Sequence, residues 1–515
     1  MTGDDEGFIH LFAAKAEGTP ARNFARFNGA PIGFEGLARA AQSFARGLRD
    51  LGVARGDRVA VMLRNSPETL AVLFGLARAG AVWVPVNVQL RGEGLRYILE
   101  HADPRLVIAD AELAATVRGC GAALRDLPLL TLGEPDTPLR LEALLERGTG
   151  FAEPLPRADD PFAIMYTSGT TGKPKGVIVT HRMLRLAGEA AALVSAARDE
   201  DVLLMWEPLY HIGGAQLLVL PLIREATLAM IERFSASRFW QQAREYGATH
   251  IHYLGGILQI LLKQPPAALD RKHGVRIAWG GGCPKDVWRP FMERFGVEIR
   301  ECYGMTEACS ITTYNDTGVV GAVGRPVPWF TVELRPEDGR ADGRPASAGA
   351  RGEIVVRTSR PGALFPGYFR NPDASAAALK EGALLTGDLG SFDREGNLIF
   401  HGRLGDNVRT KGENVTAWEV EHVAAAHPAV EDCAMIGVTA DAGEEDIKLF
   451  LKLKPDARID FAELSAWLGE RLAPYQNPRY LALVDDFERT PSQRIMKHRL
   501  PRDTRACWDR LAQKN

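Results

Sequence analysis

The chain has no long hydrophobic run, no basic amino-terminal segment and no C-x-x-C pair. Its most apolar window, Leu70 to Val88, is interrupted by Arg78 and Pro85, which argues against a membrane-spanning helix. The acidic start, residues 1–6, carries no basic region before an apolar stretch, so we expect no signal peptide. The six scattered cysteines argue against a disulfide framework or a zinc cluster and fit a reducing cytoplasm.

An excess of one charge sign is also absent. The sequence has 62 Lys and Arg against 65 Asp and Glu, which gives a formal net charge of -3, and the two signs are interleaved. A nucleic-acid or membrane-surface binder would usually show basic runs, so neither partner is expected. An anionic ligand must therefore be held by a local arrangement of donors.

What the chain does have is length and a regular alternation of elements. Its 515 residues exceed the size at which one core stops growing, so two or more domains are expected. Apolar residues recur at helical steps over 37–51, and Gly52 follows at the expected helix end. A second helix should run from Ser66, as N-cap before a proline, to Ala79. Strands expected at 57–63, 82–86 and 106–109 indicate α/β layers around a mostly parallel sheet.

Two later segments divide the rest of the chain. Residues 336–352 are rich in Gly, Pro, Ala and Asp, which is typical of a surface connection between strands. After residue 403 the pattern restarts, so we expect a small C-terminal domain. Its expected elements are a helix near 418–426, strands near 433–438 and 448–454, and a helix near 461–472.

The most informative segment is Tyr166 to Gly176, YTSGTTGKPKG. Glycines let backbone N–H groups close around an anion, hydroxyls add donors, and lysines supply charge where phosphates would lie. A flexible polar hairpin is the structural alternative. A Walker A loop requires Gly where Thr167 stands and Ser or Thr where Pro174 stands, so a P-loop NTPase is disfavoured.

Three further segments follow in order: Tyr303 to Glu307 (YGMTE), Thr386 to Gly390 (TGDLG) and Gly402 to Asp406 (GRLGD). With them, the sequence closely resembles the adenylate-forming superfamily, which includes acyl-CoA synthetases, peptide-synthetase adenylation domains and firefly luciferase. The resemblance extends along nearly the whole chain. It implies an α/β fold: a large N-terminal domain of layered α/β sheets with a small β-barrel-like subdomain, and a small mobile α+β C-terminal domain. The implied domains are 1–402 and 407–515, with a hinge at 403–406 that includes Asp406.

The same resemblance implies an ATP-dependent acyl-CoA ligase. In its first half-reaction a carboxylic acid and ATP give an acyl-adenylate and pyrophosphate, and in the second the thiol of coenzyme A displaces AMP. ATP, Mg²⁺ and coenzyme A are the implied cofactors, a small carboxylic acid is the implied substrate, and fatty acid metabolism is the implied context. A cytoplasmic location is expected.

The resemblance also assigns the nucleotide site. Tyr303 offers a flat face for adenine, Thr306 and Glu307 supply oxygen atoms suited to Mg²⁺, and Asp388 and Arg403 would contact the ribose. The structural alternatives are a helix cap at Tyr303 to Glu307, an Asx-turn at Asp388 and a surface ion pair of Arg403 with Asp406. The implied nucleotide contacts are Thr167, Ser168, Gly169, Thr170, Thr171, Gly172, Lys173, Lys175, Gly281, Gly282, Tyr303, Gly304, Thr306, Asp388 and Arg403, with Thr170 and Glu307 at the metal.

For the acid, His211 in EPLYHIGG matches a family residue at the mouth of the acyl pocket, and a purely structural histidine is the alternative. The segment GGGCP, Gly280 to Pro284, resembles the glycine-rich strand end beside the acyl group, where only glycine allows close approach. Cys283 is expected to pack rather than react, because no basic partner is evident. The implied substrate contacts are His211, Gly214, Tyr253, Gly280, Gly281 and Met305.

The C-terminal motif departs from the family. A Ser-Gly-Lys-like motif usually carries the lysine that reaches the α-phosphate and the substrate carboxylate, and here Arg494 occupies that position. Arg494 stays cationic, but Arg and Lys are not interchangeable at a tightly shaped site, so Lys497 is the second candidate for the catalytic cation. Earlier in the chain, the run KGEN, Lys411 to Asn414, replaces a more usual Gly-Gly pair. Lys411 and Gly412 are the candidates for coenzyme A binding.

Two other functions stay open at this point. One is an adenylating enzyme that loads a carrier protein, although the aspartate which pairs with a substrate amine and a following carrier domain are both missing. The other is a catalytically silent nucleotide-binding homologue, prompted by Arg494. The segment Lys411 to Val415 faintly resembles carnitine-type CoA ligases, but the acid is not readable from the sequence. The oligomeric state is equally open, with a homodimer as one option.

Overall fold

The structure is a computed structural model that describes residues 6–121, 127–133, 140–146, 148, 150–167, 174–336, 349–404, 407–410, 413–439, 445–489 and 495–512. All counts of elements and contacts below refer to those residues. The chain forms two compact units. The first comprises 1–167, 174–332 and 356–384, and the second comprises 168–173, 333–355 and 385–515.

A six-stranded sheet organises the amino-terminal part of the first unit. Its order is β6-β5-β3-β4-β7-β8, and all neighbours are parallel except β7 and β8, which form an antiparallel hairpin. The mostly parallel sheet predicted from the alternation of elements is thus confirmed. Its strands are β3 (Arg58–Met62), β4 (Val82–Pro85), β5 (Leu106–Asp110), β6 (Leu129–Leu132), β7 (Pro161–Thr167) and β8 (Lys175–Thr180).

The two helices predicted beside this sheet are present. Helix α2 (Phe34–Asp50) is followed by Gly52 at φ +75°, a conformation that glycine adopts without the steric cost of a Cβ. Helix α3 (Pro67–Ala79) begins where the Ser66 hydroxyl accepts a hydrogen bond from Thr69 N at 3.2 Å. The other helices of this part are α1 (Phe8–Gly18), α4 (Gly92–Ala102), α5 (Ala114–Arg118) and α6 (Leu141–Leu145).

A nine-stranded sheet, β15-β14-β13-β12-β11-β9-β10-β1-β2, forms the rest of the first unit. Its six central strands, from β13 to β1, are parallel. The strands are β1 (Asn23–Phe27), β2 (Ala30–Gly33), β9 (Val202–Met205), β10 (Thr227–Met230), β11 (His250–Leu254), β12 (Ile277–Gly281), β13 (Glu298–Tyr303), β14 (Thr313–Tyr314) and β15 (Arg325–Pro326).

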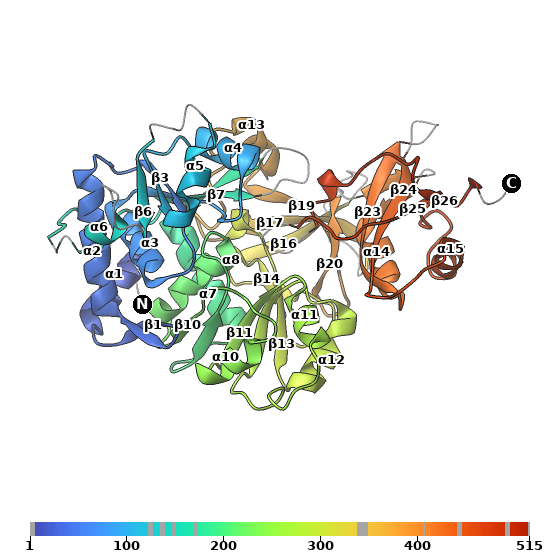
Figure 1. The fold of residues 1–515 in the computed structure, drawn as a ribbon, viewed down its shortest axis with the longest axis horizontal. Helices are drawn as coiled ribbons and strands as arrows, with labels where there is room; N and C mark the ends of the chain where they lie inside the picture. The colour runs from blue at the N-terminus through green and yellow to red at the C-terminus, as the bar shows by residue number, and fades with distance from the viewer. Residues whose placement is uncertain are drawn as a thin grey trace. The chain divides into compact units, whose positions relative to one another are not determined.

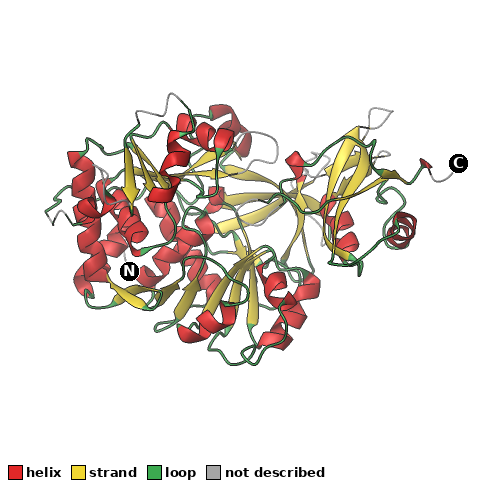
Figure 2. Ribbon diagram, viewed as in Figure 1, coloured by secondary structure: helices red, strands yellow, loops and turns green. Residues whose placement is uncertain are grey.

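Helices pack on this sheet to form its hydrophobic core (Figures 1 and 2). Tyr253 of β11 lies in one buried cluster with Trp288 and Phe291 of α12, and residues of α10 and α11 complete that layer. Tyr253 therefore points toward these helices. The helices are α7 (His181–Ser195), α8 (Ile212–Ala215), α9 (Leu220–Ile223), α10 (Phe239–Glu245), α11 (Ile257–Lys263) and α12 (Lys285–Phe295). A further helix, α13 (Pro372–Ala378), contacts the strand Leu379–Lys380 of a different sheet.

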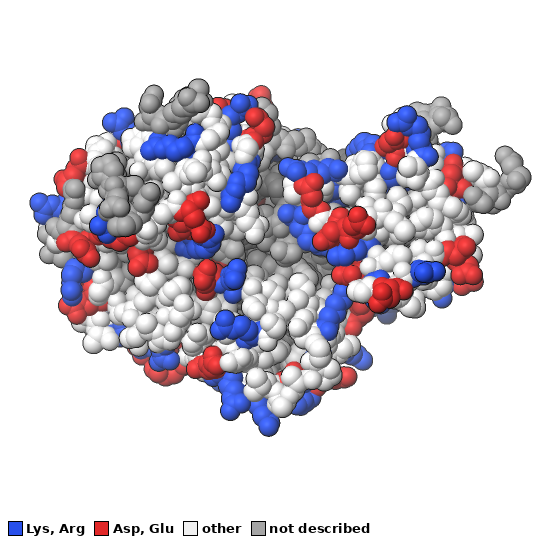
Figure 3. Space-filling view, viewed as in Figure 1, with Lys and Arg blue, Asp and Glu red and all other residues white. Residues whose placement is uncertain are grey.

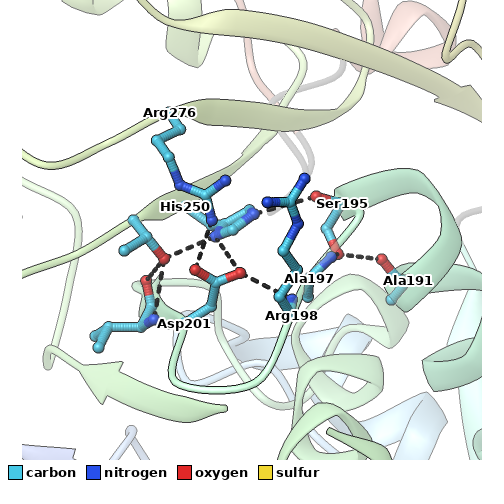
Figure 4. Close-up of polar contacts among 9 residues, drawn as sticks. Ala191, Ser195, Ala197, Arg198, Asp201, His250 and Arg276 are labelled. Carbon is cyan, nitrogen blue, oxygen red and sulfur yellow. Dashed lines mark hydrogen bonds and ion pairs between the residues drawn. The ribbon is translucent and has the colours of Figure 1, made fainter. Parts of the chain in front are cut away.

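A buried polar cluster ties three strands of this sheet together at their amino-terminal ends (Figure 4). Asp201, just before β9, accepts hydrogen bonds from the Arg276 guanidinium at 2.6 Å and from Arg198 N at 2.8 Å. His250, the first residue of β11, has its Nδ1 3.8 Å from an Asp201 oxygen and its Nε2 3.1 Å from the carbonyl oxygen of Ser195, the last residue of α7. The cluster thus joins β9, β11, β12 and α7.

A five-stranded sheet of order β16-β17-β19-β18, with β20 paired to β19, corresponds to the predicted barrel-like subdomain. The predicted connection at 336–352 does join two strands, and its residues 337–348 lie outside the described part of the chain. The strands are β16 (Phe330–Pro336), β17 (Arg351–Thr358), β18 (Leu379–Lys380), β19 (Ala383–Phe392) and β20 (Leu398–Arg403).

The predicted C-terminal α/β elements are all present. A four-stranded sheet, β23-β24-β25-β26, packs with α14 and α15 around buried residues such as Val420, Leu449 and Leu468. The elements are β21 (Asn407–Thr410), β22 (Glu413–Thr416), α14 (Ala417–Ala425), β23 (Val430–Thr439), β24 (Glu445–Leu453), α15 (Phe461–Gly469), β25 (Tyr480–Leu483), the 3₁₀ turn η6 (Lys497–Arg499) and β26 (Trp508–Asp509).

The surface agrees with the charge balance of the sequence. On the face drawn in Figure 3, basic and acidic side chains are interspersed, as expected for a net charge of -3. Within the described ranges, every helix is too short or too polar to cross a membrane.

Candidate active site

The predicted phosphate loop joins β7 and β8. Residues 168–173 lie outside the described part of the chain, but Thr167 ends β7 opposite Lys175, which begins β8. Helix α4 holds both ends of the loop. Its Tyr97 hydroxyl donates to the carbonyl oxygen of Pro174 at 3.1 Å, and its His101 Nδ1 lies 2.7 Å from the hydroxyl of Tyr166. The hairpin alternative is thus correct for the flanking strands, while phosphate binding by the loop stays a prediction.

Tyr368 brings Glu307 close to the second strand of that hairpin. Its main chain pairs with Val177 of β8, its hydroxyl donates to Glu307 Oε1 at 2.8 Å, and the Lys175 ammonium lies 5.1 Å above its ring. Glu307 is only 4 % exposed. Tyr368 could not be predicted from the sequence, because its contact with Glu307 joins segments that are distant along the chain.

The segment Tyr303 to Glu307 spans the end of β13 and the start of a 3₁₀ turn, Thr306–Ala308. The turn has no side-chain cap, so the capping alternative does not explain these residues. Tyr303, Thr306 and Glu307 are all buried. A Cβ on Gly304 would lie 2.1 Å from the carbonyl oxygen of Ser310, so the close approach of two backbone segments requires glycine there.

The glycine-rich end of β12 is packed against β11. Gly280 has φ +154°, and a Cβ there would lie 1.9 Å from the carbonyl oxygen of Tyr253. A Cβ on Gly214 would likewise lie 2.3 Å from the carbonyl oxygen of Pro208. Main-chain packing alone therefore requires both glycines, and a role beside adenine or the acyl group is an additional prediction.

A buried carboxylate follows β9 near the predicted acyl-binding residues. Glu207, which is 0 % exposed, has its Oε1 2.7 Å from Nδ1 of His252 and accepts a hydrogen bond from Trp206 N at 3.2 Å. The Trp206 indole N–H donates to the carbonyl oxygen of His252 at 2.9 Å, and the Trp279 ring lies 4.3 Å from the imidazole of His252. Sequence reasoning missed this pair, since one histidine and one glutamate 45 residues apart form no pattern.

His211 lies at the start of α8. Its Nδ1 accepts a hydrogen bond from Gly213 N at 3.1 Å, so it caps this short helix. A Cβ on Gly213 would lie 3.1 Å from that nitrogen and 3.5 Å from Cε1 of His252, which shows that the two imidazoles border the same point. The structural role that was the alternative for His211 is therefore real, and its predicted contact with the acid stays a prediction.

A second buried carboxylate, Glu301, lies on β13 next to the glycine segment. It accepts hydrogen bonds from the Tyr253 hydroxyl at 2.6 Å, from Gly282 N, and from Cys283 N at 3.2 Å. Burial raises the pKa of Glu301 to about 7, against the lowering effect of these hydrogen bonds. Burial also raises the pKa of the Cys283 thiol, which agrees with packing rather than nucleophilic chemistry.

The second unit contains the predicted ribose-binding pair. Asp388 of β19 lies opposite Arg403 of β20, and Arg403 Nε is 2.9 Å from Asp388 Oδ1. The Asp388 side chain is 3 % exposed, and its main-chain N–H donates to the Thr386 hydroxyl at 3.1 Å. Asp388 therefore sits within a strand rather than in an Asx-turn.

Lys497 also lies in the second unit. Its ammonium is 2.9 Å from Glu421 Oε1 on α14, and the same oxygen accepts a hydrogen bond from Met435 N at 2.6 Å. Lys497 thus anchors the chain after the C-terminal motif to this helix. The other candidates in this part of the chain, Arg494, Asp406, Lys411 and Gly412, lie outside the described residues.

A resident metal cluster is not evident in the described ranges, where no three His, Cys, Asp or Glu side chains converge. Oxygen donors suited to Mg²⁺ do occur together in the Thr306 hydroxyl and the Glu307 carboxylate, which are adjacent and buried. Their chemistry fits a magnesium ion that accompanies a nucleotide.

Comparison with known proteins identifies the class. The profile of the AMP-binding enzyme family matches residues 12–369, and that of the AMP-binding enzyme C-terminal domain matches residues 419–494. The chain therefore belongs to the AMP-binding enzyme family. A crotonobetaine/carnitine–CoA ligase of Salmonella paratyphi A is 32% identical over 471 residues, which cover 87% of this chain and 89% of the relative. The corresponding ligase of Escherichia coli O1:K1 is 32% identical over 472 residues.

Solved structures agree with this class. ATP-bound MatB from Rhodopseudomonas palustris has a TM-score of 0.85 at 28% identity, covering 95% of this chain and 97% of its own. A benzoate CoA ligase from Burkholderia xenovorans LB400 has a TM-score of 0.84 at 26% identity, with 96% and 99% covered. The o-succinylbenzoate CoA synthetase MenE from Bacillus subtilis, in complex with its acyl-adenylate intermediate, has a TM-score of 0.85 at 25% identity, with 98% and 99% covered.

The resemblance inferred from four motifs is thereby confirmed, as is the α/β fold. Within its family the protein is an AMP-forming acid–CoA ligase: it makes an acyl-adenylate from a carboxylic acid and ATP, and then an acyl-CoA.

Proposed function

We propose that the predicted site residues carry out this reaction, and that the acid carries a quaternary ammonium group. The observation on which the residue assignment depends is the contact of Tyr368 with both Glu307 and β8. It places the proposed magnesium-binding carboxylate beside the strand that follows the phosphate loop. In this proposal Tyr303 contacts the adenine, Glu307 the magnesium ion, and Asp388 and Arg403 the ribose.

In the first half-reaction, a carboxylate oxygen of the acid forms a bond with the α-phosphorus of ATP, and the bond to the leaving pyrophosphate breaks. Loop N–H groups between Thr167 and Lys175, together with Lys173 and Lys175, would stabilise the phosphate charge. Magnesium, when bound at Thr170 and Glu307, would offset the charge of the nucleotide phosphates. In the second half-reaction the thiol sulfur bonds to the acyl carbon, AMP leaves, and the thiol proton passes to solvent.

We assign the cation of the first half-reaction to Arg494 and an anchoring role to Lys497. The ion pair of Lys497 with Glu421, and the hydrogen bond from Met435 N to the same oxygen, support this division. In an assay of acid-dependent pyrophosphate release, Arg494→Ala should lose at least about 100-fold in rate, and Lys497→Ala should lose much less. The reverse order would assign the catalytic cation to Lys497. Absence of turnover by the wild type on every acid tested would favour the silent homologue.

The acid class is supported by the carnitine-type relatives and by the residues around His252. Trp206 is half-buried and supplies an aromatic ring, while Trp279 and the Glu207 carboxylate lie buried behind it, on either side of His252. Aromatic faces with a nearby anion are the groups that recognise quaternary ammonium ions in proteins. Solved relatives named for benzoate and o-succinylbenzoate show that the fold also accommodates other acids.

A matched pair of acids tests this assignment. In 4-(trimethylammonio)butanoate and 5,5-dimethylhexanoate the molecular shape is the same, and only the charge of the terminal group differs. We expect kcat/KM for AMP formation to favour the cationic acid by at least about tenfold, and Glu207→Gln to reduce that ratio. Equal turnover of the two acids would contradict the quaternary ammonium assignment while leaving the ligase activity intact.

Three further predictions complete the proposal. The C-terminal domain, residues 407–515, would turn about the hinge at 403–406 between the half-reactions, with Lys411 and Gly412 contributing to the coenzyme A site. The protein would act in the cytoplasm on small acids of the fatty-acid type or their derivatives. A homodimer remains an option that size-exclusion chromatography with light scattering would test.

A further inference from the structure

Glu301 is the point at which three strands of the nine-stranded sheet are joined near their carboxyl ends. It belongs to β13, and Gly280 of β12 is its cross-strand partner. The Tyr253 hydroxyl of β11 donates to its Oε2 at 2.6 Å, while Gly282 N and Cys283 N, just beyond β12, donate to the same carboxylate. The Glu301 side chain thus bonds both to β11 and to the segment just beyond β12.

The glycine segment bonded to Glu301 has few interactions of its own that would fix its conformation. Gly280, Gly281 and Gly282 have no side chains to pack, and Gly280 and Gly282 have φ values of +154° and +99°. Glycine backbone loses more conformational entropy on ordering than that of any other residue. Two main-chain N–H groups bonded to a rigid buried carboxylate offset part of that cost and define the path of the chain at Gly282 and Cys283.

Burying the Glu301 carboxylate at this position lowers the stability of the folded state. Glu301 is 4 % exposed, and its burial raises its pKa to about 7. In the described part of the chain it forms no ion pair with Lys or Arg; its partners are a phenol and two amides. Residues that lower stability without an evident packing gain are expected where function requires them.

We propose that Glu301 is a positioning residue for nucleotide binding, which fixes the glycine segment Gly280–Gly282 and the strand end at Tyr253 in the arrangement that accepts AMP and ATP. The inference rests on the proposed function, since that function places this segment beside the adenine. Glu301 acts through the segment that it holds and does not contact the nucleotide itself. Tyr303, the proposed adenine-binding residue, lies two residues further along β13, so the two side chains lie on the same face of the sheet.

The test compares two substitutions of similar size in the full-length protein. Glu301→Met keeps the volume but accepts no hydrogen bond, whereas Glu301→Gln keeps one carbonyl oxygen for the amides and an amide group for Tyr253. We measure the dissociation constant for AMP by calorimetry, which requires no knowledge of the acid, and the KM for ATP and kcat in the pyrophosphate assay. Asp201→Asn is the matched control, because Asp201 is a buried carboxylate at the opposite end of the neighbouring strands.

Glu301→Met should weaken AMP binding by about tenfold or more, the effect expected for lost hydrogen bonds to a charged group, with KM for ATP raised more than kcat is lowered. Glu301→Gln should stay within about threefold of the wild type, and Asp201→Asn should leave AMP binding unchanged. Unchanged AMP binding in Glu301→Met would overturn the inference and leave the ligase function in place. A wild-type protein that binds neither AMP nor ATP would overturn the proposed function and this inference with it.

Discussion

The two ends of strands β9, β11 and β12 are held by similar residues in different ways. At the amino-terminal ends, Asp201 bonds to Arg276 and lies beside His250. At the carboxyl ends, Glu207 bonds to His252, and Glu301 bonds to Tyr253 and two amides. His250 and His252 are two residues apart on one strand, so they lie on the same face of the sheet.

The two ends differ in whether a Lys or Arg side chain pairs with the buried carboxylate. Asp201 has an arginine partner, and the cluster around it contains no glycine-rich segment. Glu207 and Glu301 have no Lys or Arg partner in the described ranges, and both adjoin glycines whose missing side chains allow backbone to approach backbone. Open α/β sheets bind their ligands at the carboxyl ends of parallel strands. Asp201, which has an arginine partner, therefore lies at the end opposite the proposed ligand site. Glu207 and Glu301, which have no Lys or Arg partner in the described ranges, lie at the end where we predict ligand binding.

The largest effect that would sharpen this comparison is expected at Glu307. Glu307→Gln keeps the shape of the side chain but removes the charge that would bind magnesium, so adenylation should fall by about 100-fold or more. Because Glu307 carries charge rather than core volume, unfolding by urea should change little. Pyrophosphate release over a magnesium titration is the measurement. Full activity in this variant would contradict the assignment of the carboxyl end as the nucleotide site.

A smaller loss of adenylation is expected when Glu307 is kept and Tyr368, which donates a hydrogen bond to it, is substituted. Tyr368→Phe removes the 2.8 Å hydrogen bond to Glu307 and keeps the ring that lies below Lys175. Losing one hydrogen bond to a charged group should lower adenylation by about tenfold, with a raised requirement for magnesium. A wild-type rate and an unchanged magnesium requirement in Tyr368→Phe would contradict this role of the contact with Glu307.

Glu307 and Tyr368 show how much of the proposed site can be predicted from the sequence alone. Helices α2 and α3 were predictable because their apolar spacing, the Ser66 cap and Gly52 are local signals. The motif at Tyr303 to Glu307 was also readable as a string. Tyr368, 61 residues from Glu307, and Tyr253, 48 residues from Glu301, act through contacts made only by the folded sheet. Periodicity and capping rules contain no information about such pairs, so the contacts of Tyr368 with Glu307 and of Tyr253 with Glu301 were missed. The motif residues themselves were readable, and their roles in binding stay predictions.

At the amino-terminal end, substitution should affect stability without affecting catalysis. Asp201→Asn removes the charge that pairs with Arg276, whose side chain is 43% exposed. Solvent screening limits the loss to about 1–2 kcal/mol in the free energy of unfolding. Urea unfolding measures it, and kcat/KM should stay within about twofold. A large loss of kcat/KM with unchanged stability would break the distinction between the two ends.

The smallest effect on stability at neutral pH is expected from two buried histidines that lie at the ends of α7. Their effect on the free energy of unfolding grows as the pH falls. His181 is the first residue of α7, and His250 contacts Ser195, the last residue of α7. Burial lowers the pKa of His250 to about 4 and the pKa of His181 to about 3. Both pKa values lie below the ordinary value of 6.5 for histidine. At a pH between these lowered values and 6.5, the unfolded chain therefore binds more protons than the folded chain. Stability is therefore fully present above pH 6.5 and falls as the pH drops toward 4.

Each histidine should contribute a loss of about 1.4 kcal/mol per pH unit in that window. The His181 imidazole stacks on Phe8, with ring centroids 5.2 Å apart, and neither of its ring nitrogens forms a hydrogen bond within the described residues. His181→Phe removes its titration at little cost in packing, so the slope of unfolding free energy between pH 6 and 4.5 should decrease by that amount, while AMP binding at pH 7.5 should not change. An unaltered slope would mean that His181 is not the buried neutral group described here, and that the acid sensitivity originates elsewhere in the protein.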